Sequence, residues 1–318
     1  IMAVTEGKIV LIGAGMVGSA ILSSIISMNV VSEVAVIDMN ENKAKGEVLD
    51  AIHTTAFAYS TNVNIHVGCY EDCCNAEIIV FSAGPSIKPG GADDRMALLK
   101  QNVAIVENTM KEITKYTKEA IVLIVSNPLD ILVYAAQKAV NYPKDKIFGT
   151  GTLLDSARFR QMVGHLCGID SKNVHGYVLG EHGRSAFIAW NLVNVGGVPL
   201  DKLQEVFHLD RPIDKEKLLE DVKGVGIDIV QLKGYTNSGI ALSVARVIKC
   251  IRLNEKSILP VSTVVNGAYG IQGVALSLPC IISKHGVSEV VEVALDDKAK
   301  QDLQECVDKL SEIQNSIA

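Results

Sequence analysis

The chain opens with a short apolar run, a glycine-rich turn and a second apolar run that ends in an acidic residue. Residues 9–12 are all apolar, which is typical of a β-strand covered on both faces. The turn at 13–18 has the sequence GAGMVG, and helical sequence follows it. The next apolar run, 34–37, ends at Asp38. A strand, a glycine turn, a helix and a second strand predict a parallel sheet with right-handed crossovers.

The spacing of the glycines also predicts a ligand. Gly13 allows a tight turn, Gly15 lets the backbone approach a pyrophosphate, and Gly18 lets the helix pack close to the strand. The start of the helix then faces the phosphate charge. Asp38 would accept hydrogen bonds from both ribose hydroxyls and repel a 2′-phosphate, so the pattern predicts NAD rather than NADP. A glycine turn without a ligand is the alternative, which the flanking strand and helix disfavour.

Strand and helix patterns alternate through the first half of the chain, and the pattern changes after residue 147. The runs 258–265 and 274–278 alternate like antiparallel strands with glycine turns between them. We therefore expect a Rossmann-type doubly wound parallel sheet that binds NAD over residues 1–147. An α+β substrate-binding domain with antiparallel strands is expected over 148–318.

Composition excludes several classes of protein. The 318 residues are 48% hydrophobic and 21% charged, which fits globular domains rather than a disordered chain. The net charge of -6, with no basic block, argues against nucleic acid as a partner. No apolar stretch approaches the roughly 18 residues of a membrane span, and the start lacks a basic signal region. The seven cysteines lack zinc-site spacing, so we expect a cytoplasmic protein with no metal site and no membrane partner.

A histidine in the second half has the setting of an acid–base group. His182 lies in the sequence GEHG directly after the apolar run 176–179, so we expect its imidazole at the mouth of a strand. Histidine suits proton transfer near neutral pH. A lone histidine at such a place is commonly structural. Asp155 and Arg158, three residues apart on one predicted helix face, favour the catalytic interpretation.

The predicted NAD turn and the group around His182 together indicate a hydride-transfer site. Hydride transfer to a 2-keto acid needs a proton donor, a cation at the carbonyl and a cation at the carboxylate. We expect His182 to donate the proton, with Asp155 orienting its ring and stabilising the imidazolium. The planar fork of Arg158 matches a carboxylate. Arg95 follows a polar, glycine-rich segment, 84–94, with the composition of a mobile lid. Each arginine alone is more often a surface charge or a helix salt bridge, but the combination favours a site.

Together these motifs resemble the lactate/malate dehydrogenase family over nearly the whole chain, and most closely bacterial L-lactate and L-2-hydroxyacid dehydrogenases. The resemblance implies an NAD-dependent, homo-oligomeric (tetrameric or dimeric) oxidoreductase of fermentative glycolysis. Its implied reaction is reversible hydride transfer between NADH and a 2-keto acid, pyruvate to L-lactate. The matching segments stand in the family's order: 13–18 (GAGMVG), 126–130 (SNPLD), 149–158 (GTGTLLDSAR), 180–183 (GEHG) and 233–236 (KGYT).

The resemblance also implies a role for each matching residue. His182 and Asp155 take the acid/base pair, Arg158 the substrate carboxylate, and Arg95 the lid arginine. The remaining substrate and cofactor contacts that the resemblance implies are Asn127 against substrate and nicotinamide, Thr236 in the substrate pocket, Ile240 on the nicotinamide ring, and Gly13, Gly15, Met16, Val17, Gly18, Asp38, Ala83, Gly84 and Ser126 along the cofactor.

Two positions depart from the lactate dehydrogenase pattern. Ile87 stands where such enzymes usually carry Gln and malate dehydrogenases carry Arg. An Arg would pair a second carboxylate, so its absence argues against oxaloacetate, whereas Ile87 offers an apolar wall. The lid is also longer than usual, which would let Lys88 take the place of Ile87. Arg184 replaces a common Asp. Both departures resemble L-2-hydroxyisocaproate-type dehydrogenases, which act on larger apolar 2-keto acids and are the alternative.

A regulatory site is implied as well. In relatives activated by fructose 1,6-bisphosphate, an Arg and a His line an effector site at a subunit interface, and Arg160 and His175 match them. A surface arginine and a strand histidine without a shared ligand are the alternative, since two cations are a minimal phosphate site.

Two other functions share this fold, because fold alone does not give the reaction. NAD- and manganese-dependent glycosidases would need a Cys and His metal pair near the nicotinamide, but Ser126 precedes Asn127 and no Cys adjoins it. A sensor that holds NAD without turnover would gain nothing from Asp155, Arg158 and His182.

Overall fold

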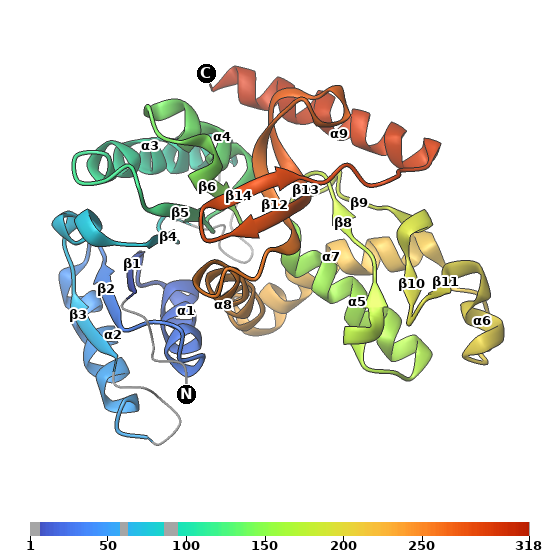
Figure 1. Ribbon diagram of the computed structural model, residues 1–318, viewed down its shortest axis with the longest axis horizontal. Coiled ribbons are helices and arrows are strands. Elements are labelled where there is room, and N and C mark those ends of the chain that lie inside the picture. Colours follow the sequence, from blue (N-terminus) through green and yellow to red (C-terminus); the bar gives the residue numbers. More distant parts are fainter. Residues whose placement is uncertain (1–6, 58–62, 86–94, 318) are drawn as a thin grey trace.

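The computed structural model describes residues 7–57, 63–85 and 95–317, apart from the side chain of Arg95. A large sheet with helices on both faces forms its centre, and smaller sheets lie beside it (Figure 1). The strands are β1 (Lys8–Ile12), β2 (Glu33–Ile37), β3 (Asn64–Val67), β4 (Ile78–Phe81), β5 (Ile121–Ile124), β6 (Ile147–Gly149), β7 (Val174–His175), β8 (Val178–Leu179), β9 (Phe187–Ile188), β10 (Asn194–Val195), β11 (Val198–Pro199), β12 (Ser257–Asn266), β13 (Gln272–Ser283) and β14 (Gly286–Val290).

The helices are of two kinds. The α-helices are α1 (Met16–Ser27), α2 (Glu41–Thr54), α3 (Arg95–Ile113), α4 (Leu129–Ala139), α5 (Leu153–Cys167), α6 (Leu203–Val206), α7 (Lys215–Lys233), α8 (Ser238–Arg252) and α9 (Asp297–Ser316). The 3₁₀ turns are η1 (Tyr70–Asn75), η2 (Lys144–Lys146), η3 (Ser171–Asn173), η4 (Trp190–Leu192), η5 (Leu200–Lys202) and η6 (Ala268–Gly270).

The first half of the chain forms the parallel part of the large sheet. Its strands lie in the order β3-β2-β1-β4-β5-β6, and each neighbouring pair is parallel. This is the doubly wound order of a dinucleotide-binding sheet. Every residue of β1, β4, β5 and β6 is buried, because helices cover both faces. The predicted Rossmann-type sheet is therefore confirmed.

Two hydrophobic cores lie on the opposite faces of this sheet. Ile9 and Leu11 of β1 pack with residues of α1, α2 and α8, whereas Val10 and Ile12 pack with residues of α3, α4 and α9. Successive side chains of a strand point to opposite faces, so a strand buried on both sides is apolar throughout. This is the physical reason for the continuous apolar run at the start of the sequence.

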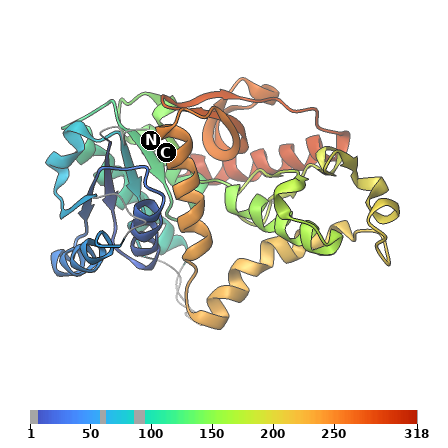
Figure 2. The same cartoon turned by 60° about the horizontal axis from the view of Figure 1, so that its bottom comes forward.

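The second half extends the same sheet with antiparallel strands, which confirms that prediction. β12 pairs with β13, and β13 pairs with β14, both antiparallel. Ser262 of β12 is also the antiparallel partner of Gly149 of β6, so one sheet spans both halves of the chain. Figure 2 shows α7 and α8 meeting at an angle, with α8 against the first half of the chain.

The predicted division after residue 147 falls inside β6 and remains a prediction. Within the described residues, no helix is both long enough and apolar enough to cross a membrane.

Candidate active site

Three charged side chains from two segments meet at the end of the sheet. Asp155 and Arg158 lie on successive turns of α5, and His182 lies in the loop between β8 and β9. Nδ1 of His182 is 2.6 Å from Oδ2 of Asp155, and Nη1 of Arg158 is 3.0 Å from Oδ1. The carboxylate thus holds the histidine with one oxygen and the arginine with the other. The structure brings these three predicted residues together.

The electrostatics of this group follow from its partial burial. Side-chain exposure is 10% for Asp155, 17% for Arg158 and 26% for His182. Burial alone would raise the pKa of Asp155, but His182 and then Arg158 outweigh it and lower that pKa. Burial alone would lower the pKa of His182, but the adjacent Asp155 outweighs it and raises that pKa. The pair therefore favours a carboxylate beside an imidazolium.

The arrangement leaves reactive atoms available on two of the side chains. Because Nδ1 of His182 contacts Asp155, Nε2 is the ring nitrogen left to exchange a proton with a ligand. Within the described residues, the Arg158 guanidinium donates one hydrogen bond, from Nη1 to Asp155. Gly226 of α7 faces the same guanidinium, since a Cβ at Gly226 would lie 3.4 Å from Nη1. The His182 imidazole and the Arg158 guanidinium thus share one carboxylate.

The main chain of His182 is held by a residue to which the sequence analysis gave no role. The N–H of His182 donates to Oδ2 of Asp130 at 2.7 Å, and Oγ of Ser262 donates to Oδ1 at 2.6 Å. Glu181 accepts from both the N–H and the hydroxyl of Ser185, at 2.9 and 2.6 Å. The sequence feature that could have pointed to Asp130 is its place at the end of the segment 126–130, as the acidic residue in the first turn of α4.

The glycine turn has a geometry that only glycine suits at two positions. Gly13 has φ +101° and donates its N–H to the carbonyl of Ile37 at 2.8 Å. A Cβ at Gly18 would overlap the carbonyl oxygen of Gly13, whereas a Cβ at Gly15 would meet open space. The turn therefore packs α1 closely against β1 and leaves its outer side clear beside Gly15, where a pyrophosphate fits.

Asp38 lies beside this turn, at the carboxyl end of β2. Its Oδ2 accepts from the N–H of Ala14 at 2.7 Å, and its Oδ1 accepts from the N–H of Asn40 at 2.8 Å. Each carboxylate oxygen retains a lone pair. Met16 is exposed, and Val17 is half-buried. These residues fit a bound dinucleotide, and their contacts with it remain predictions.

The other predicted cofactor residues follow β4 and β5. The hydroxyl of Ser126 donates to the carbonyl of Ala83 at 2.6 Å, which joins the two strand ends. The side chain of Asn102 in α3 donates to the carbonyl of Asn127 at 2.8 Å. A Cβ at Gly84 would collide with the same Asn102 side chain. The buried amide of Asn102 therefore fixes both segments at the carboxyl edge of the sheet.

Two predicted residues come from the junction of α7 and α8. Thr236 lies in the short link between the helices, and Ile240 lies in the first turn of α8 and packs against the core beneath α1. Gly239 between them abuts Leu154 of α5, because a Cβ there would lie 2.9 Å from the leucine side chain. This close approach places the junction beside the helix that carries Asp155.

Comparison with known proteins accounts for both halves of the chain. Residues 7–149 match the lactate/malate dehydrogenase NAD binding domain, and residues 152–318 match the lactate/malate dehydrogenase alpha/beta C-terminal domain. The chain belongs to the lactate/malate dehydrogenase family. It is therefore an NAD-dependent oxidoreductase, as predicted, and NAD is its cofactor.

Several relatives of this family cover nearly the whole chain. L-lactate dehydrogenase 2 of Clostridium acetobutylicum is 51% identical over 97% of this chain and 96% of the relative. L-lactate dehydrogenase of Selenomonas ruminantium is 44% identical over 91% of each chain. The crystal structure of minor L-lactate dehydrogenase from Enterococcus mundtii, in a ligands-bound form, has a TM-score of 0.93 and 34% identity, covering 99% of both chains.

Part of the lid predicted by this family resemblance lies outside the described residues. Ile87, Lys88 and the side chain of Arg95 belong there, and α3 begins at Arg95. Arg184 lies within the described part, is exposed, and its carbonyl accepts from Nζ of Lys223 at 3.0 Å.

The residues that match the family's effector site lie on two neighbouring elements. Arg160 is on α5, and His175 is exposed on β7, where it pairs with Asn194. Nη2 of Arg160 is 3.5 Å from the carbonyl of Lys172, and its buried Nε donates to no described residue.

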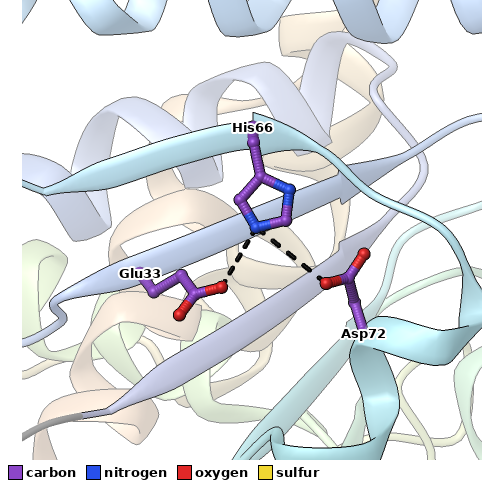
Figure 3. A group of neighbouring side chains, drawn as sticks. All are labelled: Glu33, His66 and Asp72. Carbon is purple, nitrogen blue, oxygen red and sulfur yellow. Dashed lines mark hydrogen bonds and ion pairs between the residues drawn. The ribbon is translucent and has the colours of Figure 1, made fainter.

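One cluster within the described chain has the spacing of a metal site. Glu33, His66 and Asp72 point toward one another (Figure 3), and one ligand atom of each lies within 4.8 Å of the others. Nζ of Lys8 is 2.6 Å from Asp72 and 3.1 Å from Glu33. The ammonium group therefore already supplies the cation between the carboxylates. Burial opposes the charge of Lys8, but these two carboxylates outweigh it and raise its pKa. The expectation that the chain carries no metal remains a prediction.

Proposed function

We propose that this family member reduces pyruvate to L-lactate with NADH and catalyses the reverse reaction. The observation that carries the proposal is the 2.6 Å contact between Nδ1 of His182 and Oδ2 of Asp155, with Arg158 on the other carboxylate oxygen. The relatives named above are L-lactate dehydrogenases that match almost end to end, which supports the same reaction here.

The side chains of this site suit each requirement of the reaction. Bound NADH supplies the hydride for the carbonyl carbon. His182 holds a proton at Nε2 and donates it to the developing alkoxide, which contributes roughly 10²–10⁴-fold to the rate. Asp155 keeps the ring oriented and stabilises its protonated form, which raises the pKa of His182 and favours the proton donor. In lactate oxidation the same nitrogen accepts the hydroxyl proton.

The substrate is bound through its carboxylate and carbonyl. Arg158 grips the carboxylate with its planar fork, and Arg95 polarises the carbonyl when the lid closes and excludes water. Asn127 and Thr236 contact the substrate within the pocket. Position 87 carries an isoleucine and no arginine, so a second carboxylate would find no cation there, which disfavours oxaloacetate.

The second candidate substrate class is the larger apolar 2-keto acids. An isoleucine at position 87, together with the longer lid, favours L-2-hydroxyisocaproate-type specificity. One extra methylene in an apolar pocket is worth roughly 1–3 kcal/mol, so the choice between the two classes is a matter of pocket size.

The cofactor contacts, the assembly and the regulation complete the proposal. Gly13, Gly15, Gly18 and Asp38 contact the adenosine and pyrophosphate of NAD. The chain divides into a cofactor unit up to residue 147 and a substrate unit after it. It works in the cytoplasm as a homotetramer or homodimer, and fructose 1,6-bisphosphate binds Arg160 and His175 across a subunit interface.

The deciding experiment is NADH oxidation with a panel of pyruvate, 2-ketoisocaproate and oxaloacetate. We expect the highest kcat/KM with pyruvate and the lowest with oxaloacetate. His182→Asn measures the background rate, and His285→Asn, at an exposed histidine, serves as the matched control. Failure to oxidise NADH with any of the three acids would reject the proposed reaction.

A further inference from the structure

One buried carboxylate beneath the active site has no role in the chemistry proposed above. Asp130, in the first turn of α4, is 2% exposed. Its Oδ2 accepts from the main-chain N–H of His182, and its Oδ1 accepts from the hydroxyl of Ser262. A single carboxylate thus joins α4, the loop between β8 and β9, and β12.

Keeping this carboxylate charged costs free energy. Burial raises the pKa of Asp130 to about 6, although the hydrogen bonds from Ser262 and His182 oppose the rise. A neutral amide of the same shape would satisfy both partners, because its oxygen can accept from the N–H and its nitrogen can donate to the hydroxyl. A costly charge beside a reactive group indicates that the charge itself is used.

The charges around His182 show what the charge of Asp130 does. Burial lowers the pKa of His182, Asp155 raises it through Nδ1, Asp130 raises it further, and Arg158 opposes both carboxylates. The two carboxylates act through different atoms, since Asp155 contacts the ring and Asp130 contacts the main chain. Removing the charge of Asp130 therefore leaves the contact between ring and Asp155 in place.

The remaining titratable groups near Asp130 do not substitute for it. Glu181, in the same loop, raises the pKa of Asp130 by repulsion. Cys306 of α9 is buried, and burial raises its pKa to about 12, so the thiol is uncharged at neutral pH. Lys223 interacts with Glu181, and burial lowers the pKa of this lysine.

We propose that Asp130 is a positioning residue for His182, which as a carboxylate fixes the histidine's main chain and favours the protonated imidazole. The inference rests on the proposed role of His182 as the acid. Asp130 acts through His182, and its contribution is largest in the direction that consumes a proton, the reduction of the 2-keto acid.

Asp130→Asn tests the charge while keeping the shape. We expect the alkaline limb of kcat/KM for pyruvate to move to lower pH, with the KM for NADH unchanged. At pH values above the alkaline limb of the parent, the kcat/KM of the variant should be about tenfold lower than that of the parent for each pH unit of displacement. An NMR titration of His182 in the NADH-bound enzyme, assigned with His182→Gln, should show the same displacement. Asp130→Ser is a second neutral variant with the same expected result.

A graded variant and a control support this test. Ser262→Ala removes a hydrogen bond that lowers the pKa of Asp130, so the titration of His182 should move in the same direction as in Asp130→Asn, but less far. Asp296→Asn alters a carboxylate that accepts from the N–H of Ala299 at 2.8 Å, at the start of α9. Neither the kinetic limb nor the titration should change in it.

The outcomes distinguish this inference from the proposed function. Coincident His182 titrations in the parent, Asp130→Asn and Asp130→Ser would overturn the inference. A displaced titration with an unmoved kinetic limb would support the link between Asp130 and His182, but would overturn His182 as the acid.

Discussion

His182 and Asp155 form a hydrogen-bonded pair in which Nδ1 lies 2.6 Å from Oδ2. The contact raises the pKa of His182 and contributes to the lowered pKa of Asp155. For His182, the stabilisation is full below the unfolded pKa of 6.5 and disappears as the pH rises through the higher folded pKa. For Asp155, it is present above 3.8 and lost as the pH falls through the lower folded pKa. Both contributions are therefore full between 3.8 and 6.5, in the mildly acidic range.

Replacing the acid should damage turnover more than cofactor binding. His182→Asn removes the proton donor, so kcat should fall roughly 10²–10⁴-fold, while the Kd for NADH, measured by fluorescence titration, changes little. His285→Asn is the control. A His182→Asn enzyme with more than about a third of the parent kcat would remove this residue from the mechanism.

Arg158→Lys should weaken substrate binding, because an ammonium group cannot form the two-bond fork with a carboxylate. The expected loss in transition-state binding is roughly 2–5 kcal/mol, seen as a raised KM for pyruvate. Arg246→Lys, at an arginine paired with Glu255 away from the site, is the matched control. An unchanged KM in a correctly folded Arg158→Lys enzyme would contradict the assignment.

Asp130→Asn should increase stability at neutral pH while it impairs the enzyme. The pKa of Asp130 rises from 3.8 to about 6 on folding, so the native state binds the proton more tightly than the unfolded state. The free energy of unfolding therefore falls as the pH rises from 3.8 to about 6, by roughly 3 kcal/mol at most (2.2 pH units at 1.36 kcal/mol each). Urea unfolding of parent and variant at acid and neutral pH measures this. A variant less stable than the parent at neutral pH would argue against a costly charge.

The parallel sheet and the glycine turn could be predicted because their causes are local. Burial on both faces makes β1 apolar throughout, and φ +101° at Gly13 requires glycine. Asp155 and His182 were grouped by the chemistry that they share. The contact of Asp130 with Ser262 could not be predicted in the same way. These residues are 132 positions apart. The pairing of β12 with β6 brings Ser262 to Asp130.

Ile87→Arg tests specificity at a lid position outside the described residues. If Ile87 faces the substrate's tail, an arginine there would pair the second carboxylate of oxaloacetate. The ratio of kcat/KM for oxaloacetate over pyruvate should then rise, since a water-excluded charge pair can contribute several kcal/mol, roughly 2–5. Lys88→Arg is the neighbouring comparison. A shift in the ratio with Lys88→Arg alone would show that the longer lid places position 88 against the substrate.

Arg160 lies on α5, the same helix as Asp155 and Arg158, so a ligand bound at Arg160 would contact the helix that carries two residues of the candidate active site. If Arg160 and His175 bind fructose 1,6-bisphosphate across a two-fold interface, two copies of each would surround its phosphates. The bisphosphate should then lower the KM for pyruvate, and a small shift of α5 would couple the two sites. Because protonated histidine binds phosphate better than neutral histidine, activation should be stronger at about pH 6 than at about pH 8.

The measurement is pyruvate kinetics with and without the bisphosphate, in the parent, in Arg160→Gln and in Arg211→Gln, an exposed arginine elsewhere. We expect activation in the parent and in Arg211→Gln, and none in Arg160→Gln. Equal KM values with and without the bisphosphate in the parent at the lower pH would show that Arg160 and His175 are structural. Activation that survives Arg160→Gln would instead place the effector at other residues, because the loss of one guanidinium from each copy removes half of the cations that the proposed site offers.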